Sequence, residues 1–190
     1  MSQEYYKTKE SVKEYIRLAS GVDGNELINR LKEFLPADST VLEIGSGPGT
    51  DWKLLCKDYK VTGSDSSLEF LSHLTSSHPT GKFIELDAVS LSVNEQYDGI
   101  YSNKVLHHLK DNELIDSIER QNEILNSGGI VCHSFWKGKG SEIFKGLFVN
   151  YHSELLLRDF FEKYFEILVL ENYAEFDEDD SIILIAKKRL

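Results

Sequence analysis

The stretch VLEIGSGPGT, residues 41–50, has the residue types and spacing of a ligand-binding turn. A short apolar run carries the carboxylate of Glu43, and Gly45, Gly47 and Gly49 then alternate with small residues. Glycine has no Cβ, so such a turn can adopt positive φ and bring the backbone close to a ligand. A buried parallel strand that ends in this kind of turn is typical of sites for nucleotide-like cofactors. A glycine-rich turn that binds no ligand is the alternative interpretation.

The glycine spacing separates two kinds of cofactor. The dinucleotide fingerprint is G-x-G-x-x-G, whereas this chain has G-x-G-x-G with threonine at position 50. The stretch resembles motif I of the class I S-adenosylmethionine-dependent methyltransferases, E/D-x-G-x-G-x-G, in which the acidic residue lies beneath the turn. Glu43 and the three glycines match this motif position for position, with Ser46 between the first two glycines. The resemblance therefore implies S-adenosyl-L-methionine as the cofactor.

Two further carboxylates follow predicted strands. Asp65 lies about twenty residues beyond the turn, where a carboxylate can accept hydrogen bonds from both ribose hydroxyls. Ser66 follows it and is expected beside the cofactor. The resemblance also implies that Asp87 and the backbone N–H of Ala88 contact the adenine, and that Asn103 contacts the cofactor where the fourth strand ends. Helix capping by Asp65 and a strand-end turn at Asp87 are the alternatives.

The segment SNKVLHHL, residues 102–109, resembles the part of small-molecule methyltransferases that lines the methionine end of the cofactor. Its adjacent histidines, His107 and His108, point in different directions, so we expect one to pack and one to face the site. Histidine can act as a general base because its unperturbed pKa is near 6.5. Both are candidate catalytic residues, with a structural role as the alternative. Neither forms a metal-ligand cluster with nearby cysteines or carboxylates, and no metal site is predicted.

The acceptor side of the site is less specific in sequence. Aromatic and basic residues interleaved with glycines over 133–152 predict a mobile cover, with His133, Trp136 and Tyr151 as candidate substrate contacts. Aromatic faces for the sulfonium could come from the leading tyrosines, Tyr5, Tyr6 and Tyr15, or from Trp136. Three lysines in the cover could attract an anionic acceptor, or belong to a solvated loop: Lys137, Lys139 and Lys145.

The elements that must position these residues alternate along the chain. Apolar runs predict strands at 40–44, 60–64, 82–86, 98–102 and 130–135, separated by amphipathic helices, which is typical of a parallel sheet covered on both faces. Two last runs, 165–171 and 181–186, are joined by an acidic loop too short for a crossover helix, so they should form an antiparallel hairpin. The predicted α/β fold is a Rossmann-like three-layer sandwich with a mostly parallel seven-stranded sheet.

Helices are expected at 4–19, 24–35 and 51–57, after Ser66 or Ser67, from Asp111 to Gly128, and after Ser153. Leu68 and Ile115 should face inward, with Leu125 in the last turn of its helix. We expect one domain, in which residues 1–23 form a helical cap segment on a Rossmann-like core of residues 24–190. The acidic run 175–180 is expected to be a solvated loop.

Composition restricts the class of protein. A chain of 190 residues with 41% hydrophobic content fits one soluble domain. Its net charge of -11 disfavours nucleic acid as a partner, because lysine and arginine contacts to phosphate supply most of that affinity. We see no apolar run near the ~18–20 residues of a membrane span, no secretory signal, and only two distant cysteines, Cys56 and Cys132. We therefore expect a cytoplasmic protein without membrane partners; nothing indicates its oligomeric state.

These features together predict an S-adenosylmethionine-dependent methyltransferase that acts on a small-molecule acceptor. A non-catalytic protein that holds the same cofactor would carry the same motifs and is an open alternative. A nicotinamide-dependent oxidoreductase is disfavoured by the glycine spacing and the terminal hairpin. The acceptor atom, whether O, N, C or S, is not indicated by the sequence.

Overall fold

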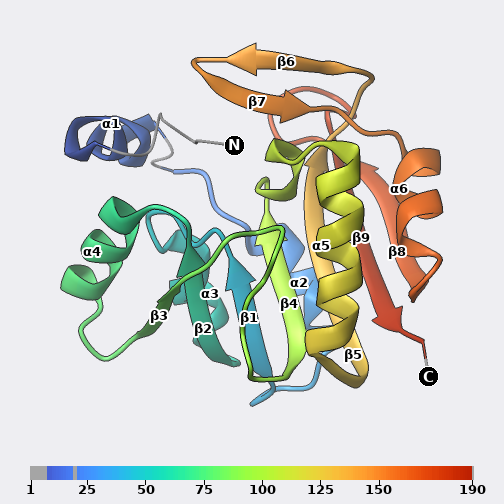
Figure 1. Ribbon diagram of the computed structural model, residues 1–190, viewed down its shortest axis with the longest axis horizontal. Helices are drawn as coiled ribbons and strands as arrows, with labels where there is room; N and C mark the ends of the chain where they lie inside the picture. Colours follow the sequence, from blue (N-terminus) through green and yellow to red (C-terminus); the bar gives the residue numbers. More distant parts are fainter. Residues whose placement is uncertain (1–7, 19–20, 190) are drawn as a thin grey trace.

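The computed structural model describes residues 8–18 and 21–189, and its centre is a seven-stranded sheet of order β3-β2-β1-β4-β5-β9-β8 (Figure 1). Five strands pair in parallel: β1 (Thr40–Ile44), β2 (Lys60–Asp65), β3 (Lys82–Glu85), β4 (Tyr97–Asn103) and β5 (Leu125–Trp136). The last strand, β9 (Ser181–Lys188), lies between β5 and β8 (Phe165–Tyr173) and is antiparallel to both. The predicted mostly parallel sheet with an antiparallel C-terminal hairpin is confirmed.

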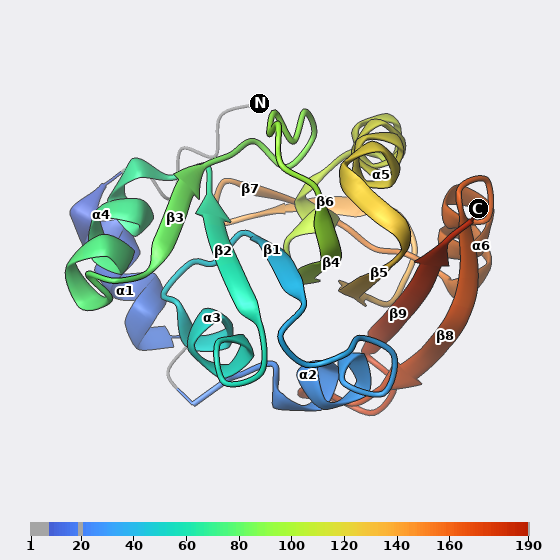
Figure 2. The ribbon, with the colours of Figure 1, turned by 90° about the horizontal axis from the view of Figure 1, so that it is seen from below.

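Helices cover both faces of the sheet, as Figure 2 shows. On one face lie α2 (Asn25–Leu31) and α3 (Thr50–Leu55), and on the other α5 (Asp111–Ile124) and α6 (Glu154–Phe161). The helix α4 (Leu68–Ser77) packs on β2 and β3, and α1 (Lys9–Leu18) packs on α4. A 3-10 turn, η2 (Leu106–His108), follows β4. The three layers of the predicted sandwich are therefore present.

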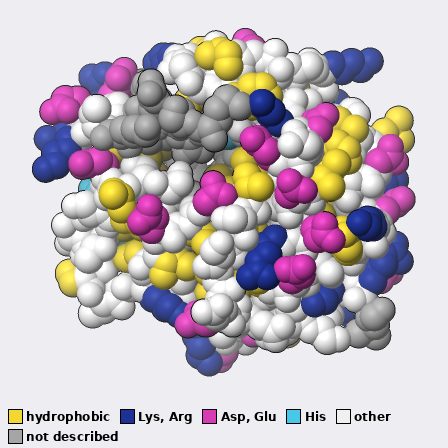
Figure 3. Space-filling model, in the orientation of Figure 1, with side chains coloured by type: hydrophobic (Ala, Val, Ile, Leu, Met, Phe, Trp, Pro, Cys, Tyr) yellow, Lys and Arg dark blue, Asp and Glu magenta, His cyan; other side chains and the backbone are white. Residues whose placement is uncertain are grey.

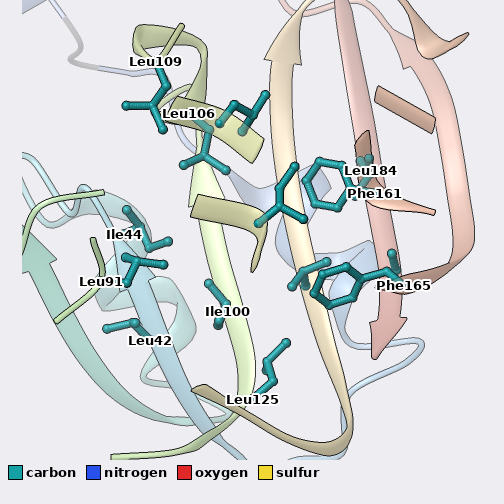
Figure 4. Packing of buried hydrophobic residues seen from close by; sticks show 14 of the residues in the cluster. Leu42, Ile44, Leu91, Ile100, Leu106, Leu109, Leu125, Phe161, Phe165 and Leu184 are labelled. Atoms are coloured by element: carbon teal, nitrogen blue, oxygen red, sulfur yellow. The ribbon is translucent and has the colours of Figure 1, made fainter. Parts of the chain in front are cut away.

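The core is divided by the sheet because side chains of a strand alternate between its faces. Leu42 and Ile44 of β1 belong to the cluster that includes α5 and α6, whereas Val41 packs with α2 and α3. Figure 4 shows the first cluster extending from β1 to the aromatic rings of Phe161 and Phe165. Burial of such side chains stabilises by about 1.5–3 kcal/mol each, so both faces hold the strand ends in fixed positions.

The helices differ from expectation at their ends. α5 ends at Ile124, and Leu125 starts β5, where it pairs with Tyr97 and is buried as a strand residue. Gly128 lies inside β5, where the pairing with β4 is irregular, and has φ of 72° instead of ending a helix. Leu68 is 65% exposed and Ile115 is 39% exposed, so both predictions of inward packing are wrong. Ser67 caps α4, and that start directs Phe70 and Leu74 to the interior in place of Leu68.

The glycine-rich segment after β5 is a second, two-stranded sheet. Its strands are β6 (Ser141–Phe144) and β7 (Leu147–Asn150), which pair antiparallel across a two-residue turn. Lys145 and Gly146 in that turn both have positive φ, 49° and 81°, as a tight hairpin turn of this kind requires. Sequence reasoning missed this hairpin, which packs on η2 and lies beyond the carboxyl end of the main sheet (Figure 1).

The leading segment is described from residue 8. Helix α1 begins at Lys9, so Tyr5 and Tyr6 lie outside the described residues, while Tyr15 packs edge-on against Phe70 of α4. No helix in the described ranges is long and apolar enough to cross a membrane. Figure 3 shows Lys and Arg side chains interspersed with Asp and Glu over one face of the molecule.

Candidate active site

A cavity of about 440 Å³ opens at the carboxyl ends of β1, β2 and β4. The chain leaves β1 between β2 and β4, so the strand order reverses there, and crevices at such a point are the usual ligand sites of open α/β sheets. The described residues that line it come from α1, the glycine turn, the ends of four strands and the loop between β8 and β9. They include nearly all the predicted cofactor residues: Glu43, Gly45, Ser46, Gly47, Asp65, Ser66, Asp87, Ala88 and Asn103.

The glycine turn needs its glycines for two different reasons. Gly45, Gly47 and Gly49 have φ of 72°, 47° and 84°, a region that side chains rarely adopt. A Cβ at Gly45 would lie 2.6 Å from Val105, and one at Gly49 would lie 2.7 Å from Leu74. At Gly47 the nearest atom would be 4.0 Å away, so this position faces open space in the cavity. Gly49 is the N-cap residue of α3 and does not itself line the cavity.

Glu43 lies beneath the turn, with an exposed fraction of 2%. The Ser46 hydroxyl donates to it at 2.5 Å, and Ser46 also accepts from the Ser64 N–H at 3.1 Å, which joins the turn to β2. Burial raises the pKa of Glu43 to about 8, and the charges of Asp51 and Asp65 add to that rise, although the Ser46 hydrogen bond opposes it. The carboxyl group beneath the turn is thus largely protonated at neutral pH.

Asp65 closes the other side of the turn. One carboxylate oxygen accepts from the Gly47 N–H at 3.0 Å and the other from the Ser67 N–H at 2.8 Å. Burial raises the pKa of Asp65, and these backbone hydrogen bonds oppose the rise. Ser67 caps α4 with its own side chain, which accepts from the Phe70 N–H. Asp65 therefore organises the turn and lines the cavity at once, and its contact with a ribose stays a prediction.

Asp51 is a site residue that sequence reasoning missed. It lines the cavity and accepts hydrogen bonds from the Gly24 N–H at 2.7 Å, the Tyr101 hydroxyl at 2.7 Å and the Asn103 amide at 3.1 Å. A Cβ at Gly24 would lie 2.2 Å from the Tyr101 hydroxyl, so the chain enters α2 at a point where only glycine fits. Asn103 is fixed on its other side by Ser134. In sequence, Asp51 looks like an ordinary acidic residue in the first turn of a helix.

Asp87 and Ala88 form the wall beyond β3. One oxygen of Asp87 accepts from the N–H groups of Val89 and Ser90 at 3.0 and 2.9 Å, which closes a tight turn. The Ala88 carbonyl accepts from the Ser117 hydroxyl at 2.6 Å. The alternative role of Asp87 as a turn residue is therefore present, and both residues also line the cavity. Their contact with adenine stays a prediction.

The two adjacent histidines separate as expected. His108 lines the cavity, and its Nδ1 lies 2.7 Å from the Phe148 carbonyl of β7, so that nitrogen carries the proton. Burial lowers the pKa of His108, which leaves Nε2 as a free acceptor at neutral pH. His107 is buried and does not line the cavity. Desolvation, and after it the charge of His108, lowers the pKa of His107 well below its ordinary value. Only His108 is placed to act on a ligand.

None of the three predicted substrate residues lines the cavity. The interpretation of His133 is wrong, because its ring is fully buried between the Ser102 hydroxyl and the Gln121 amide, each at 2.8 Å. Burial lowers the pKa of His133 to about 3, so it is neutral. Tyr151 donates to Glu142 of the small hairpin. Trp136 lies beneath a lysine that does line the cavity, at 3.7 Å from Lys104 Nζ to the ring centroid.

The acidic loop after β8 contributes to the site, contrary to expectation. Glu175 lines the cavity and pairs with Lys104 at 2.8 Å, and both side chains are mostly buried. The prediction of a fully solvated loop is therefore wrong for Glu175. The three lysines proposed to attract an anionic acceptor do not line the cavity, and Lys137 instead lies near Glu154 and Asp179. Within the described ranges, no group of three His, Cys, Asp or Glu side chains is arranged to hold a metal ion.

Comparisons with known proteins agree with this geometry. Residues 41–129 match the family described as methyltransferase domain. A curated relative, 2-methyl-6-phytyl-1,4-hydroquinone methyltransferase of Synechocystis sp., is 31% identical over 108 residues, which are 54% of this chain. This chain spans about a third of that relative's length, 33%.

Solved structures share the fold at low sequence identity. A methyltransferase from Methanosarcina mazei has a TM-score of 0.75 at 18% identity, over 85% of this chain and 97% of that one. The 1,6-didemethyltoxoflavin-N1-methyltransferase of Burkholderia thailandensis, solved with S-adenosylhomocysteine, has a TM-score of 0.77 at 16% identity, over 93% and 82%. CalS10, an amino pentose methyltransferase from Micromonospora echinaspora, has a TM-score of 0.75 at 12% identity, over 94% and 97%.

Proposed function

We propose that this chain, which carries a class I S-adenosylmethionine-dependent methyltransferase domain, transfers the methyl group of S-adenosylmethionine to a small-molecule acceptor. One observation carries the proposal. The turn glycine Gly47, which faces open space, and the carboxylates Glu43, Asp65 and Asp87 line a single cavity at the point where the strand order reverses.

The residues present fit the cofactor. At Gly47 the backbone can approach a ligand without a side chain between them. Asp65 would accept from the ribose, Asp87 and Ala88 would contact the adenine, and Glu43 lies beneath the turn that would hold the methionine end. The cavity volume of about 440 Å³ is in the range of small-molecule and cofactor sites. When bound, S-adenosylmethionine supplies a methyl group on a positively charged sulfur.

The chemistry asks little of the chain beyond position. Methyl transfer is an in-line displacement with a neutral thioether as leaving group, so the chain need not donate a proton to it. The enzyme contributes by orienting the acceptor and excluding water. Where the acceptor must lose a proton, His108 Nε2 is the acceptor available in the cavity, because Nδ1 is committed to the Phe148 carbonyl. Burial keeps His108 neutral by lowering its pKa.

Two observations support a small acceptor. The cavity is partly enclosed and its volume is limited to about 440 Å³. Proteins similar in fold or sequence are named as acting on 1,6-didemethyltoxoflavin, an amino pentose and a hydroquinone. We further propose a cytoplasmic location, which is supported by the two cysteines, Cys56 and Cys132, since both are free thiols.

A matched pair of glycine variants tests the cofactor site. Gly47 and Gly140 both have positive φ and open surroundings, but only Gly47 lines the cavity. Alanine at either position introduces similar backbone strain, so Gly47→Ala should lower the affinity for S-adenosylhomocysteine at least tenfold and Gly140→Ala should leave it unchanged. Isothermal titration calorimetry measures both, with NAD as the competing ligand. Stronger binding of NAD than of S-adenosylhomocysteine would overturn the proposal.

Turnover separates an enzyme from a cofactor-holding protein. Transfer of labelled methyl from S-adenosylmethionine to at least one member of a panel of small acceptors is expected. Binding of the cofactor with no transfer to any member would favour the non-catalytic alternative.

A further inference from the structure

Lys104 is an unusual residue at the end of β4. It adopts φ of 52°, in the left-handed region that lysine rarely occupies, and strain of this kind is retained mostly at functional sites. Its ammonium group is enclosed by three oxygen atoms: Ser181 Oγ at 2.6 Å, Glu175 Oε2 at 2.8 Å and Tyr173 Oη at 3.2 Å. The ring of Trp136 covers it from another side. The ammonium has three protons and these partners occupy them, so Lys104 is an anchor and not a free cation.

The anchored partner is Glu175, which lies in a loop with its own internal support. Asp180 accepts from the backbone N–H groups of residues 175–177 at 2.9 to 3.1 Å, which closes the loop. Phe176 stacks on Trp136 with ring centroids 5.9 Å apart. The Oε2 atom of Glu175 accepts from both Lys104 and Tyr173 at 2.8 Å. The Oε1 atom has no hydrogen-bond partner among the described residues, and Glu175 lines the cavity.

Glu175 lies at the end of the cavity away from the predicted adenine and ribose contacts. The lining follows the order of the strands: Asp87 comes after β3, Asp65 ends β2, Glu43 is on β1, and Lys104 follows β4. Glu175 comes from the loop next to β9, beyond β4 in this order. Asn103, at the end of β4, is the last predicted cofactor contact in this order, so the end of the cavity beyond it is the end with Glu175.

The charge of the lining selects against anions. Six carboxylates line the cavity together with the largely protonated Glu43; the six are Asp23, Asp51, Asp65, Asp87, Glu113 and Glu175. Among the described lining residues, Lys104 is the single lysine or arginine, and its charge is already paired with Glu175. Coulomb interactions in such a partly enclosed space oppose an anionic acceptor and favour a neutral or cationic one.

We propose that Glu175 is the acceptor-recognition residue, that its Oε1 accepts a hydrogen bond from an N–H group, and that the acceptor is therefore an amine. Lys104 is a positioning residue, which holds Oε2 so that Oε1 is presented to the cavity. This inference rests on the proposed function and names the substrate class of the same site.

Methyl transfer to an amine balances at this arrangement. The nitrogen lone pair forms the new N–C bond while the S–C bond breaks, and the sulfur keeps the bonding electron pair as a neutral thioether. Positive charge therefore moves from sulfur to nitrogen, where a carboxylate positioned beforehand stabilises it. The methylated ammonium then loses one proton, to His108 Nε2 or to water.

Glu175→Gln is the central test, because it keeps the size of the side chain and removes its charge. The control is Glu178→Gln, which changes the same charge at an exposed position of the same loop that does not line the cavity. The acceptor panel pairs primary and secondary amines with alcohols and carboxylic acids of the same skeleton. We expect methylation of amines, a fall of at least tenfold in kcat/KM for the best amine with Glu175→Gln, and less than twofold with Glu178→Gln. Affinity for S-adenosylhomocysteine should change less than twofold in both.

The role of Lys104 is tested by rescue. Lys104→Met should lower kcat/KM for the amine at least tenfold, mainly through a higher KM. Its melting temperature should fall, because Glu175 is left buried without a cation, and must stay above the assay temperature as the check on folding. Lys104→Arg restores a cation beside Glu175 and should recover part of the loss. The positioning role would be refuted if Lys104→Met and Lys104→Arg lowered kcat equally and Lys104→Arg recovered none of the lost kcat/KM.

The outcomes separate this inference from the function on which it rests. Failure of the unchanged chain to bind S-adenosylhomocysteine would overturn the proposed function and this inference with it. Cofactor binding combined with methylation of acids or alcohols in preference to amines would overturn the inference alone. Unchanged amine kinetics in Glu175→Gln would do the same. If the panel gives no turnover, calorimetric titration of its amines into the protein saturated with S-adenosylhomocysteine decides: no binding, or equal binding by Glu175→Gln, overturns it.

Discussion

Glu43 should make the stability of the folded chain depend on pH. Its pKa is raised from 4.5 to about 8, chiefly by burial. Below about 4.5 the group is protonated in both the folded and the unfolded chain, so its stabilising contribution is fully present. As pH rises, the unfolded chain loses this proton first, and the folded chain loses it only near pH 8. The free energy of unfolding should therefore fall between pH 5 and 8 and level off above that.

The magnitude follows from the same pKa values. One pKa unit is worth about 1.4 kcal/mol, so a rise from 4.5 to about 8 corresponds to a loss of about 5 kcal/mol between pH 4 and pH 9. This is a large part of the total stability of about 5–15 kcal/mol that is usual for a domain. Glu43→Gln replaces the protonated carboxyl by a neutral amide that can still accept from the Ser46 hydroxyl. The variant should lack this loss and become the more stable protein above pH 7.

Urea unfolding of both proteins at half-unit intervals from pH 5 to 9 measures the effect. The difference between the two unfolding free energies should change by several kcal/mol over this range, while Glu178→Gln should follow the unchanged chain. Parallel curves for the unchanged chain and Glu43→Gln would refute the raised pKa. A bound cation would lower the pKa of Glu43, so affinity for S-adenosylmethionine should rise from pH 6 to 8 with release of a proton, and that rise should be absent from Glu43→Gln.

Three further predictions concern the other residues of the site. Asp65→Ala should weaken S-adenosylhomocysteine binding more than tenfold in calorimetry, because charge-assisted hydrogen bonds are worth about 1.5–3 kcal/mol each. It should also lower the melting temperature of the free protein, because the N–H groups of Gly47 and Ser67 lose their acceptor. Unchanged affinity would make Asp65 only a turn residue. His133→Leu should lower the free energy of unfolding in urea by about 2–4 kcal/mol, because the Ser102 hydroxyl and the Gln121 amide lose their buried partner. The loss should be the same at pH 7 and pH 8, because a pKa of about 3 keeps the His133 ring neutral. A loss below about 1 kcal/mol would show that these hydrogen bonds do not stabilise the fold. The triple change of Lys137, Lys139 and Lys145 to Ser should alter amine turnover less than twofold at low and high salt, since none of the three lines the cavity. A larger loss that becomes smaller as salt rises would restore the anionic-acceptor hypothesis.

Local chemistry explains what could be predicted from the sequence. The turn at 45–49 was predictable because glycine alone tolerates its backbone angles, and the strand before it because a buried parallel strand is continuously apolar. The position of Asp65 at the cavity was predictable for another reason, because the carboxyl ends of parallel strands meet at one edge of the sheet. The antiparallel pairing of β8 and β9 followed from the short loop between them, which excludes a crossover.

Contacts between distant segments explain what could not be predicted. Asp51 is a site residue because it accepts from Gly24, Tyr101 and Asn103, which lie on three other segments. His133 resembles a functional histidine in sequence, but its position on the inner side of β5 places it between Ser102 and Gln121. Neither fact leaves a pattern within a window of a few residues, which is the range over which spacing and propensity act.

Contacts with distant segments also decide what an acidic run in the sequence means, as the loop between β8 and β9 shows. A run of acidic residues is usually a solvated surface loop, and Glu178 fits that expectation. Glu175 differs because Lys104 and Tyr173 compensate for its burial, and Asp180 differs because hydrogen bonds from the loop backbone outweigh its desolvation and hold its pKa near 2. Burial of a carboxylate is tolerated only where partners of this kind are present. The residue to examine in such a run is therefore the one with a buried cation as its partner, and here that residue is the one that reaches the cavity.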